Sequence, residues 1–237
     1  IKSGRINFIQ LSTRPDYINQ DILDLLKQHH VKWIELGAQS LDPEVLLWTK
    51  RGHTVEDVEK SAQLILQNGF ELGLQMMVGL PGDTPEKSFE TAQKIIRLKA
   101  HYTRIYPTLV IKNTDLETEY LRGDYTPLTI EQAVKWVAPL VTLFEKNQVQ
   151  ILRIGLHPSE GFINRETLVA GPFHVSFKEL VLTEIWREKL IEISQHNHSD
   201  TFIVEVPKEE INYAIGYRSS NKILMEQRFR KVIFKQL

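Results

Sequence analysis

Two stretches of the chain place polar side chains directly after apolar runs, where each run reaches a glycine-containing turn. They read Glu35-Leu-Gly-Ala-Gln-Ser-Leu-Asp and Gln75-Met-Met-Val-Gly-Leu-Pro-Gly-Asp-Thr, and Lys50-Arg-Gly-His-Thr lies between them. An α/β barrel builds its ligand site from polar residues at the C-terminal ends of successive strands. These stretches therefore predict a cavity for a polar ligand. Taken alone, the stretch around Arg51 is also compatible with a solvated turn before a helix that Thr54 caps.

Alternation along the apolar runs assigns the polar residues to one face of a sheet, because successive strand side chains point to opposite sides. Glu35, Gln39 and Gln75 then point into the barrel, while their aliphatic neighbours face the helices. The same rule adds Gln10, Arg104, Tyr106, Thr108, Arg153 and His157 to the interior. Buried amides and ions need partners. One alternative is therefore a network that satisfies itself, with Glu35 paired to Arg104 or Arg153, and the other is a ligand cavity.

Five apolar runs are expected to form the strands that position these residues. They are Ile6–Leu11, Lys32–Leu36, Glu71–Val78, Arg104–Ile111 and Gln150–Leu156. Helical periodicity separates them, over Asp57–Asn68, Glu86–Leu98 and Thr129–Lys146 among others. Alternating strands and helices predict parallel βα units. Since five strands are too few to close a barrel, we expect an α/β fold with a partial, open TIM-type barrel over residues 1–160.

The regular alternation of apolar strands and helices ends after His157-Pro158. Residues 161–198 are expected to form a connection, a loop over Gly161–Phe173 followed by an amphipathic helix over Phe177–Ile193. Residues 199–237 are expected to form a small α+β module. Its predicted order is a strand at Thr201–Val206, a helix from Lys208, a turn at Gly216, a second helix and a strand at Lys231–Phe234.

The composition is that of an ordinary globular protein, with 42% hydrophobic and 25% charged residues. With a net charge of -1, the chain as a whole has no electrostatic attraction to nucleic acid or to an anionic membrane. With no apolar run of membrane-spanning length and no secretory signal, we expect a cytoplasmic protein that makes no membrane contact. We expect no metal site from its own side chains, because His157, His174, His196 and His198 lack metal-ligand spacing and cysteine is absent.

The ordered fragments resemble the later part of the radical SAM barrel over roughly residues 6–180. The match is closest to the elongator catalytic-subunit branch and looser to oxygen-independent coproporphyrinogen III oxidase. The fragments are Leu11-Ser-Thr-Arg-Pro-Asp, Glu35-Leu-Gly-Ala-Gln-Ser-Leu, Arg51-Gly-His-Thr, Gly79-Leu-Pro-Gly-Asp-Thr, Arg104-Ile-Tyr-Pro-Thr-Leu-Val-Ile, Arg153-Ile-Gly-Leu-His-Pro and Gly171-Pro-Phe-His. Seven fragments in order are a far more specific signal than any single motif.

The resemblance implies roles for five residues in binding S-adenosyl-L-methionine (SAM). Gln39 resembles the residue that contacts the SAM ribose region, and Arg51 resembles the arginine that pairs with the SAM carboxylate. Gln75 stands where related members contact the ribose hydroxyls. Ser12 occupies a position where coproporphyrinogen oxidases carry glutamate, and Glu35 shares the fragment of Gln39. All five are candidate cofactor-binding residues, and no catalytic residue is assigned.

The resemblance also implies a [4Fe-4S] cluster held by three cysteines, reductive cleavage of SAM, hydrogen abstraction from a substrate, and a reductant protein. The cysteine loop would lie before Ile1, so we expect that an N-terminal portion is missing and that this chain is inactive by itself. The alternatives are a coproporphyrinogen-oxidase-like enzyme acting on a tetrapyrrole and a cluster-free RNA-binding or scaffold protein.

The tail around Gly216-Tyr-Arg-Ser resembles a KH-type nucleic-acid module, whose glycine turn clamps backbone phosphates. Ser219 replaces the second glycine of that turn. Arg218 and Lys222 are therefore candidate RNA-binding residues, and the implied substrate is a tRNA base. The alternative is a basic C-terminal cap that packs on the barrel.

Overall fold

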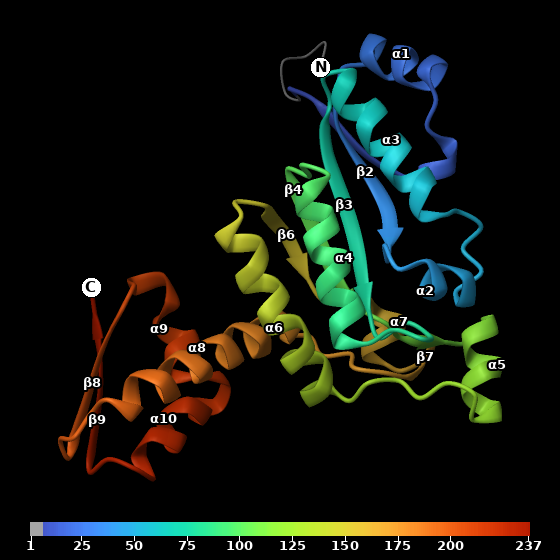
Figure 1. Ribbon diagram of the computed structural model, residues 1–237. Coiled ribbons are helices and arrows are strands. Elements are labelled where there is room, and N and C mark those ends of the chain that lie inside the picture. Colours follow the sequence, from blue (N-terminus) through green and yellow to red (C-terminus); the bar gives the residue numbers. More distant parts are fainter. Residues whose placement is uncertain (1–6) are drawn as a thin grey trace.

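The computed structural model describes residues 7–237, and its central feature is a five-stranded parallel sheet. Its strand order is β1-β2-β3-β4-β6. The strands are β1 (Ile9–Thr13), β2 (Val31–Gln39), β3 (Glu71–Val78), β4 (Tyr102–Pro107) and β6 (Gln150–Ile154). Every neighbouring pair is parallel, and Figure 1 shows the strands as one twisted, open layer. The predicted open α/β part-barrel of about five strands is confirmed.

Helices follow the strands as the βα pattern predicted. They are α1 (Gln20–Gln28), α2 (Pro43–Trp48), α3 (Val55–Gln67), α4 (Pro85–Arg97) and α6 (Ile130–Lys146). Thr54, Thr84 and Thr129 each accept a hydrogen bond from a backbone N–H in the first turn of the helix that follows. These caps fix where α3, α4 and α6 begin, and therefore where the preceding loops leave the sheet.

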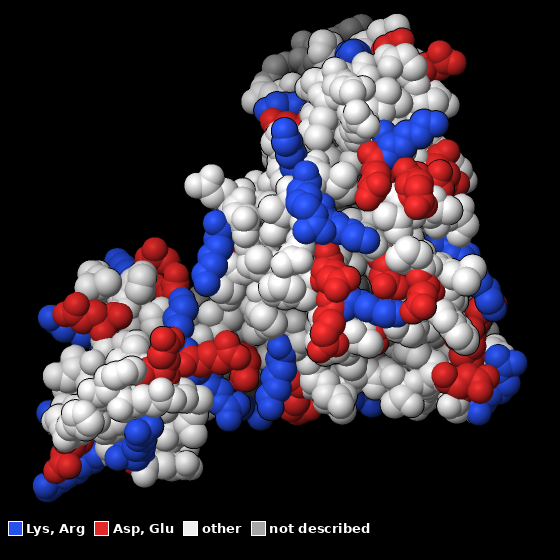
Figure 2. All heavy atoms as spheres, viewed as in Figure 1, with Lys and Arg blue, Asp and Glu red and all other residues white. Residues whose placement is uncertain are grey.

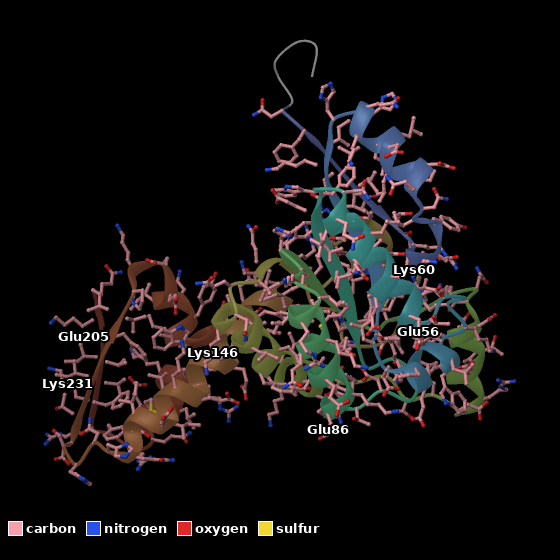
Figure 3. The ribbon with its side chains drawn as sticks, turned by 45° about the horizontal axis from the view of Figure 1, so that its top comes forward. Glu56, Lys60, Glu86, Lys146, Glu205 and Lys231 are labelled. Carbon is pink, nitrogen blue, oxygen red and sulfur yellow. The ribbon has the colours of Figure 1, made fainter. Side chains whose placement is uncertain are left out.

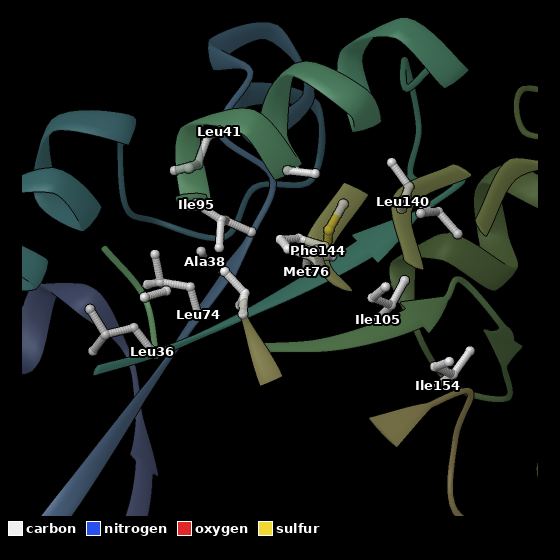
Figure 4. Packing of buried hydrophobic residues seen from close by; sticks show 14 of the residues in the cluster. Leu36, Ala38, Leu41, Leu74, Met76, Ile95, Ile105, Leu140, Phe144 and Ile154 are labelled. Atoms are coloured by element: carbon white, nitrogen blue, oxygen red, sulfur yellow. The ribbon is translucent and has the colours of Figure 1, made fainter. Parts of the chain in front are cut away.

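The hydrophobic core lies between one face of the sheet and α3, α4 and α6. Leu36, Leu74, Met76 and Ile105 are fully buried on that face, and helix residues such as Ile95 of α4 pack against them (Figure 4). The alternation expected from the sequence is therefore correct. We call the opposite side the inner face, and it carries Gln10, Ser12, Trp33, Glu35, Gly37, Gly73, Gln75, Met77, Tyr102, Arg104, Tyr106 and Arg153.

Three predicted boundaries are wrong for identifiable reasons. The run Arg104–Ile111 is not one strand, because pairing with β3 ends at Pro107, and β5 (Val110–Ile111) instead pairs antiparallel with β7 (Leu168–Ala170). The expected loop over 161–173 contains β7 and the end of α7 (Glu160–Ile163). Gly155 has a φ of +81°, so β6 ends before Leu156. Ile6, the predicted start of the first strand, lies outside the described residues. The remaining helix of this part is α5 (Asp115–Arg122).

The C-terminal residues form the predicted strand, helix, turn, helix and strand. After α8 (Phe177–Gln195) come β8 (Thr201–Val206), α9 (Ile211–Ile215), α10 (Ser220–Glu226) and β9 (Lys231–Gln236). The two strands pair in parallel, and their outer face carries the exposed Glu205 and Lys231 (Figure 3).

Helix α8 belongs to two hydrophobic clusters. Phe177 and Val181 pack in the core of the large sheet, whereas Trp186 and Leu190 pack with the C-terminal module. Thr183 Oγ1 also accepts a hydrogen bond of 3.0 Å from the Tyr217 N–H. The module is therefore seated on α8, although the domain limits at 160/161 and 198/199 stay predictions. No helix among residues 7–237 is long and apolar enough to cross a membrane, and the cytoplasmic location remains a prediction as well.

Candidate functional site

Two amides meet on the inner face where β2 and β3 end. The Gln75 Nε2 donates a hydrogen bond of 3.2 Å to Gln39 Oε1. Gln39 is 3% exposed and has a φ of +64°, at a register shift between β2 and β3. Non-glycine residues rarely adopt this left-handed conformation, and those that do gather at functional sites. Two of the predicted interior residues, Gln39 and Gln75, thus lie in contact near the C-terminal edge of the sheet, and their role in binding SAM stays a prediction.

Arg51 lies beside these amides. The position that a Cβ would take at Gly37 is 2.7 Å from Gln39 Nε2 and 3.8 Å from Arg51 Nη2, so both groups approach the same bare stretch of backbone. Among residues 7–237 the Arg51 guanidinium makes no ion pair with a carboxylate. Burial, and secondarily the nearby Arg14 charge, lower the pKa of Arg51. A half-buried cation without a counter-ion favours an anionic ligand.

The loop that carries Arg51 is fixed to the end of β2 by His53. The His53 ring is 6% exposed, and its Nε2 lies 3.3 Å from the Ala38 carbonyl oxygen, which it can reach only as a donor. Burial lowers the pKa of His53 and favours the neutral ring. Thr54 and Asp57 form a reciprocal capping box at the start of α3. The segment is, as the alternative expected, a turn before a helix that Thr54 caps, but it is not fully solvated, since the buried His53 imidazole anchors it.

Glu35 and Arg104 form an ion pair at the next level of the inner face. The Arg104 Nη1 lies 3.0 Å from Glu35 Oε1, which also accepts a hydrogen bond of 2.8 Å from Ser12 Oγ. Glu35 is 1% exposed. This is the self-satisfied pair left open by the sequence, with Arg104 rather than Arg153 as the partner. Ser12 and Arg104 therefore share one oxygen of Glu35, and this network forms no hydrogen bond with the Gln39–Gln75 pair among residues 7–237.

Aromatic rings occupy the level nearest the N-terminal ends of the strands. Trp33 packs between Phe8 and Tyr102 with its ring tilted by 40° to each, at centroid distances of 4.9 and 5.3 Å, and the Tyr102 ring lies over Gly73, where no Cβ would fit. Four buried polar atoms here have no partner among the described residues: Gln10 Nε2, Trp33 Nε1, Glu35 Oε2 and Tyr102 OH. Burial raises the pKa of Tyr102. The sequence prediction omitted Tyr102 because it began that strand at Arg104, two residues too late.

The loop after β3 is held by Asp83. Its carboxylate accepts hydrogen bonds from the N–H groups of Gly79 and Thr84 and from Ser88 Oγ. The Tyr125 hydroxyl donates to the Gly79 carbonyl oxygen at 2.6 Å. Burial raises the pKa of Asp83 to about 6, although the three donors act in the opposite direction. Four hydrogen bonds thus hold the glycine-containing turn.

The two RNA-binding candidates lie in the C-terminal module, apart from the inner face. The Arg218 guanidinium lies 5.5 Å from the centroid of the Tyr217 ring, and Lys222 Nζ lies 3.6 Å from Glu226 Oε1. Arg218 and Ser219 both have left-handed backbone conformations. Figure 2 shows acidic and basic groups intermixed over the module on the displayed face, so no broad basic field surrounds them there.

The side chains of this chain do not fit an iron–sulfur cluster. Cysteine is absent from the sequence, and within residues 7–237 no three His, Asp or Glu side chains form a metal-binding group. Thiolates hold such clusters. The donor set around Arg51 does suit SAM, because a guanidinium can pair with its carboxylate and two amides can hydrogen-bond hydroxyls.

Comparison with known proteins gives two consecutive family matches. Residues 1–95 match the radical SAM superfamily, and residues 100–187 match the radical SAM C-terminal domain. Elp3 of Methanocaldococcus infernus, solved with an N-terminal deletion, superimposes with a TM-score of 0.71 at 28% identity, covering 77% of this chain and 42% of that protein.

Curated relatives agree with this match. The tRNA uridine(34) acetyltransferase of Methanocaldococcus jannaschii is 32% identical over 57% of this chain and 26% of its own length. Elongator complex protein 3 of Saccharomyces cerevisiae is 32% identical over 57% of this chain and 25% of its own length. The chain thus matches about a quarter of the length of each of these two relatives. Because two successive family matches cover residues 1–95 and 100–187, the chain belongs to the radical SAM superfamily, and its relatives within that superfamily include Elp3 proteins.

Proposed function

We propose that this chain forms the SAM-binding wall of an Elp3-like radical SAM enzyme that acts on tRNA. The observation that carries the proposal is the half-buried Arg51 guanidinium, which has no carboxylate partner among residues 7–237 and lies beside Gln39. The relatives named for tRNA uridine(34) support the substrate class. SAM supplies the hydrogen-abstracting chemistry when it is bound together with a cluster.

The residues of the inner face hold and orient SAM in this proposal. Arg51 pairs with the SAM carboxylate through two parallel hydrogen bonds. When SAM binds, the amides of Gln39 and Gln75 weaken their hydrogen bond to each other and form hydrogen bonds to the ribose hydroxyls. His53 keeps the Arg51 loop at the end of β2 through the Ala38 carbonyl. Glu35 has a supporting role, since its Oε1 is already shared by Ser12 and Arg104.

The cluster, its reductant protein and the loss of activity in this chain alone belong to the same proposal. Because this chain offers no thiolate, the cluster ligands must come from a different polypeptide segment, and the chain by itself should bind SAM weakly. A gene that encodes no CxxxCxxC-like segment upstream of Ile1 would contradict this part.

The test compares SAM with a ligand that lacks the carboxylate that Arg51 is proposed to bind. We expect Arg51→Gln to weaken SAM binding about ten-fold, the loss expected for one charge-assisted contact. The same variant should bind 5′-methylthioadenosine, which has no carboxylate, as the wild type does. Isothermal titration or equilibrium dialysis measures both, with exposed Arg97→Gln of α4 as the matched control.

An equal loss for both ligands would indicate disturbed folding and would refute the carboxylate role. Intact protein, with the cysteine-containing segment present, that binds neither ligand would instead favour the cluster-free RNA-binding or scaffold alternative. The tetrapyrrole enzyme remains a separate alternative, and a porphyrinogen ligand added to the same titration tests it.

RNA binding by the C-terminal module is the second part of the proposal. Arg218 and Lys222 are expected to contact backbone phosphates next to the turn at Gly216. Arg218→Glu and Lys222→Glu should each weaken tRNA binding, whereas equal and weak binding by wild type and variants would favour a packed cap. Exposed Lys231→Glu on β9 controls for a general loss of positive charge.

A further inference from the structure

A second group of donors lies on the inner face at β6, outside the proposed SAM site. Arg153 Nη1 is 3.4 Å from His157 Nδ1, and both side chains are exposed. Neither makes an ion pair with a carboxylate among residues 7–237. The guanidinium therefore keeps most of its donors free for a ligand.

The fold directs this pair toward the site. Ile154 packs into the core on the opposite side of the sheet, so its neighbour Arg153 points to the inner face. The chain then turns at Gly155, whose φ is +81° and whose missing Cβ would lie 2.9 Å from Phe177. This turn brings His157 back beside Arg153.

Register places Arg153 level with the proposed cofactor site. Gln75 pairs with Arg104 on β4, and Arg104 pairs with Arg153 on β6. Adjacent strands are about 4.8 Å apart, so Arg153 stands two strand spacings, or about 10 Å, from Gln75. Arg104, which lies between them, is already neutralised by Glu35 at 3.0 Å. The uncompensated charges of the site are therefore Arg51 on the β2 side and Arg153 on the β6 side.

The chemistry of the pair suits a phosphate. In a hydrogen bond from Arg153, the Nδ1 of His157 is the acceptor, so the proton of the neutral ring is on Nε2, which can donate outward. A guanidinium fork beside an imidazole N–H offers several donors to one tetrahedral anion. We propose that Arg153 and His157 bind a backbone phosphate of the RNA substrate and hold its nucleotide beside the SAM site. This inference rests on the proposed function, because it takes RNA as the substrate.

The experiment measures binding of a fluorescein-labelled single-stranded oligonucleotide of about 10 nucleotides that contains uridine. We expect Arg153→Gln to weaken binding about ten-fold and to reduce the slope of log affinity against log salt by about 0.7, the value for one lost phosphate contact. His157→Gln should weaken binding less. Arg153→Lys should keep the salt slope but lose part of the affinity, because lysine retains the charge without the fork.

Inorganic phosphate provides a readout that does not depend on RNA elsewhere on the protein. In protein with isotope-labelled histidine, phosphate should shift the His157 ring resonances in the wild type and in Arg97→Gln, but much less in Arg153→Gln. Resonances of His196, in the segment before β8, should not move in any of them.

Three results would overturn the inference. The first is an RNA affinity and a salt slope that are the same in Arg153→Gln and Arg97→Gln, and the second is no RNA binding by the wild type. The third is that the His157 resonances do not shift when phosphate is added. SAM titration keeps this failure distinct from failure of the proposed function. If SAM binding depends on Arg51 while Arg153→Gln leaves RNA binding intact, only the phosphate site is wrong. If SAM binding does not depend on Arg51, the RNA and phosphate measurements still decide the role of Arg153.

Discussion

Removing one member of the Glu35–Arg104 ion pair should destabilise the protein, and the cost should depend strongly on which member is removed. Arg104→Met leaves a carboxylate that is 1% exposed without its cation. Glu35→Gln leaves a guanidinium whose side chain is 27% exposed and which water can solvate. The first variant should therefore lose more stability than the second.

The magnitudes follow from the geometry of the pair. At 3.0 Å and an effective dielectric constant of about 20, the charges attract by about 5 kcal/mol, and desolvation offsets most of this energy. Orphaning a buried charge costs about 3–5 kcal/mol. Because water can enter where Arg104 is partly exposed, we expect about 3 kcal/mol for Arg104→Met. We expect about 1 kcal/mol for Glu35→Gln, since the amide still accepts from Ser12 or Arg104.

Urea unfolding followed by far-ultraviolet circular dichroism measures these free energies. The double variant should cost less than the sum of the two single variants by about 1–2 kcal/mol, because each single change already breaks the same interaction. Equal costs for the two single variants, or strict additivity, would refute the view that Arg104 neutralises a buried Glu35. Either result would return Glu35 to the candidate ligand contacts.

Three further predictions concern other parts of the chain. Gly37→Ala should weaken SAM binding several-fold, measured by titration, because its Cβ would lie 2.7 Å from Gln39 Nε2. The pKa of Asp83 is about 6 in the folded protein and 3.8 ordinarily, so the folded state binds more protons than the unfolded state. The free energy of unfolding should therefore fall by at most about 3 kcal/mol as pH rises from about 4 to about 6. Urea titrations should show this fall in the wild type and not in Asp83→Asn. Ser219→Gly should raise thermal stability by about 1 kcal/mol, because Ser219 has a φ of +61°.

The sheet was predictable because burial follows alternation. Leu36 and Leu74 alternate with Glu35 and Gln75 in the sequence, and the first two are fully buried against helices while the polar pair lies on the inner face. The starts of helices were equally predictable, since Thr54 and Thr129 cap their helices through hydrogen bonds to residues within four positions in the sequence. Local patterns therefore fix which face a side chain occupies.

Partners across the sheet were not predictable, because they depend on register and side-chain reach. Alternation placed Arg104 and Arg153 on the same face and left both as partners for Glu35; only the structure selects Arg104. The short pairing of β5 with β7 joins residues almost sixty positions apart. Tyr102 was missed because the residues that follow Ala100, His101 to Thr103, are too polar to resemble the start of an apolar strand.

The parts of the inner face differ in what they can bind. Aromatic rings of Trp33 and Tyr102 fill the part nearest the N-terminal ends of the strands, and the Glu35–Arg104 pair leaves little net charge beside them. Positive charge without a counter-ion on this face is thereby confined, among residues 7–237, to Arg51 and Arg153 near the C-terminal edge. An anionic cofactor group and an anionic substrate group would then be attracted to opposite sides of the Gln39–Gln75 pair. Under the proposed function, the neutral Gln39–Gln75 pair between the two cations would keep the two anions from competing for one guanidinium.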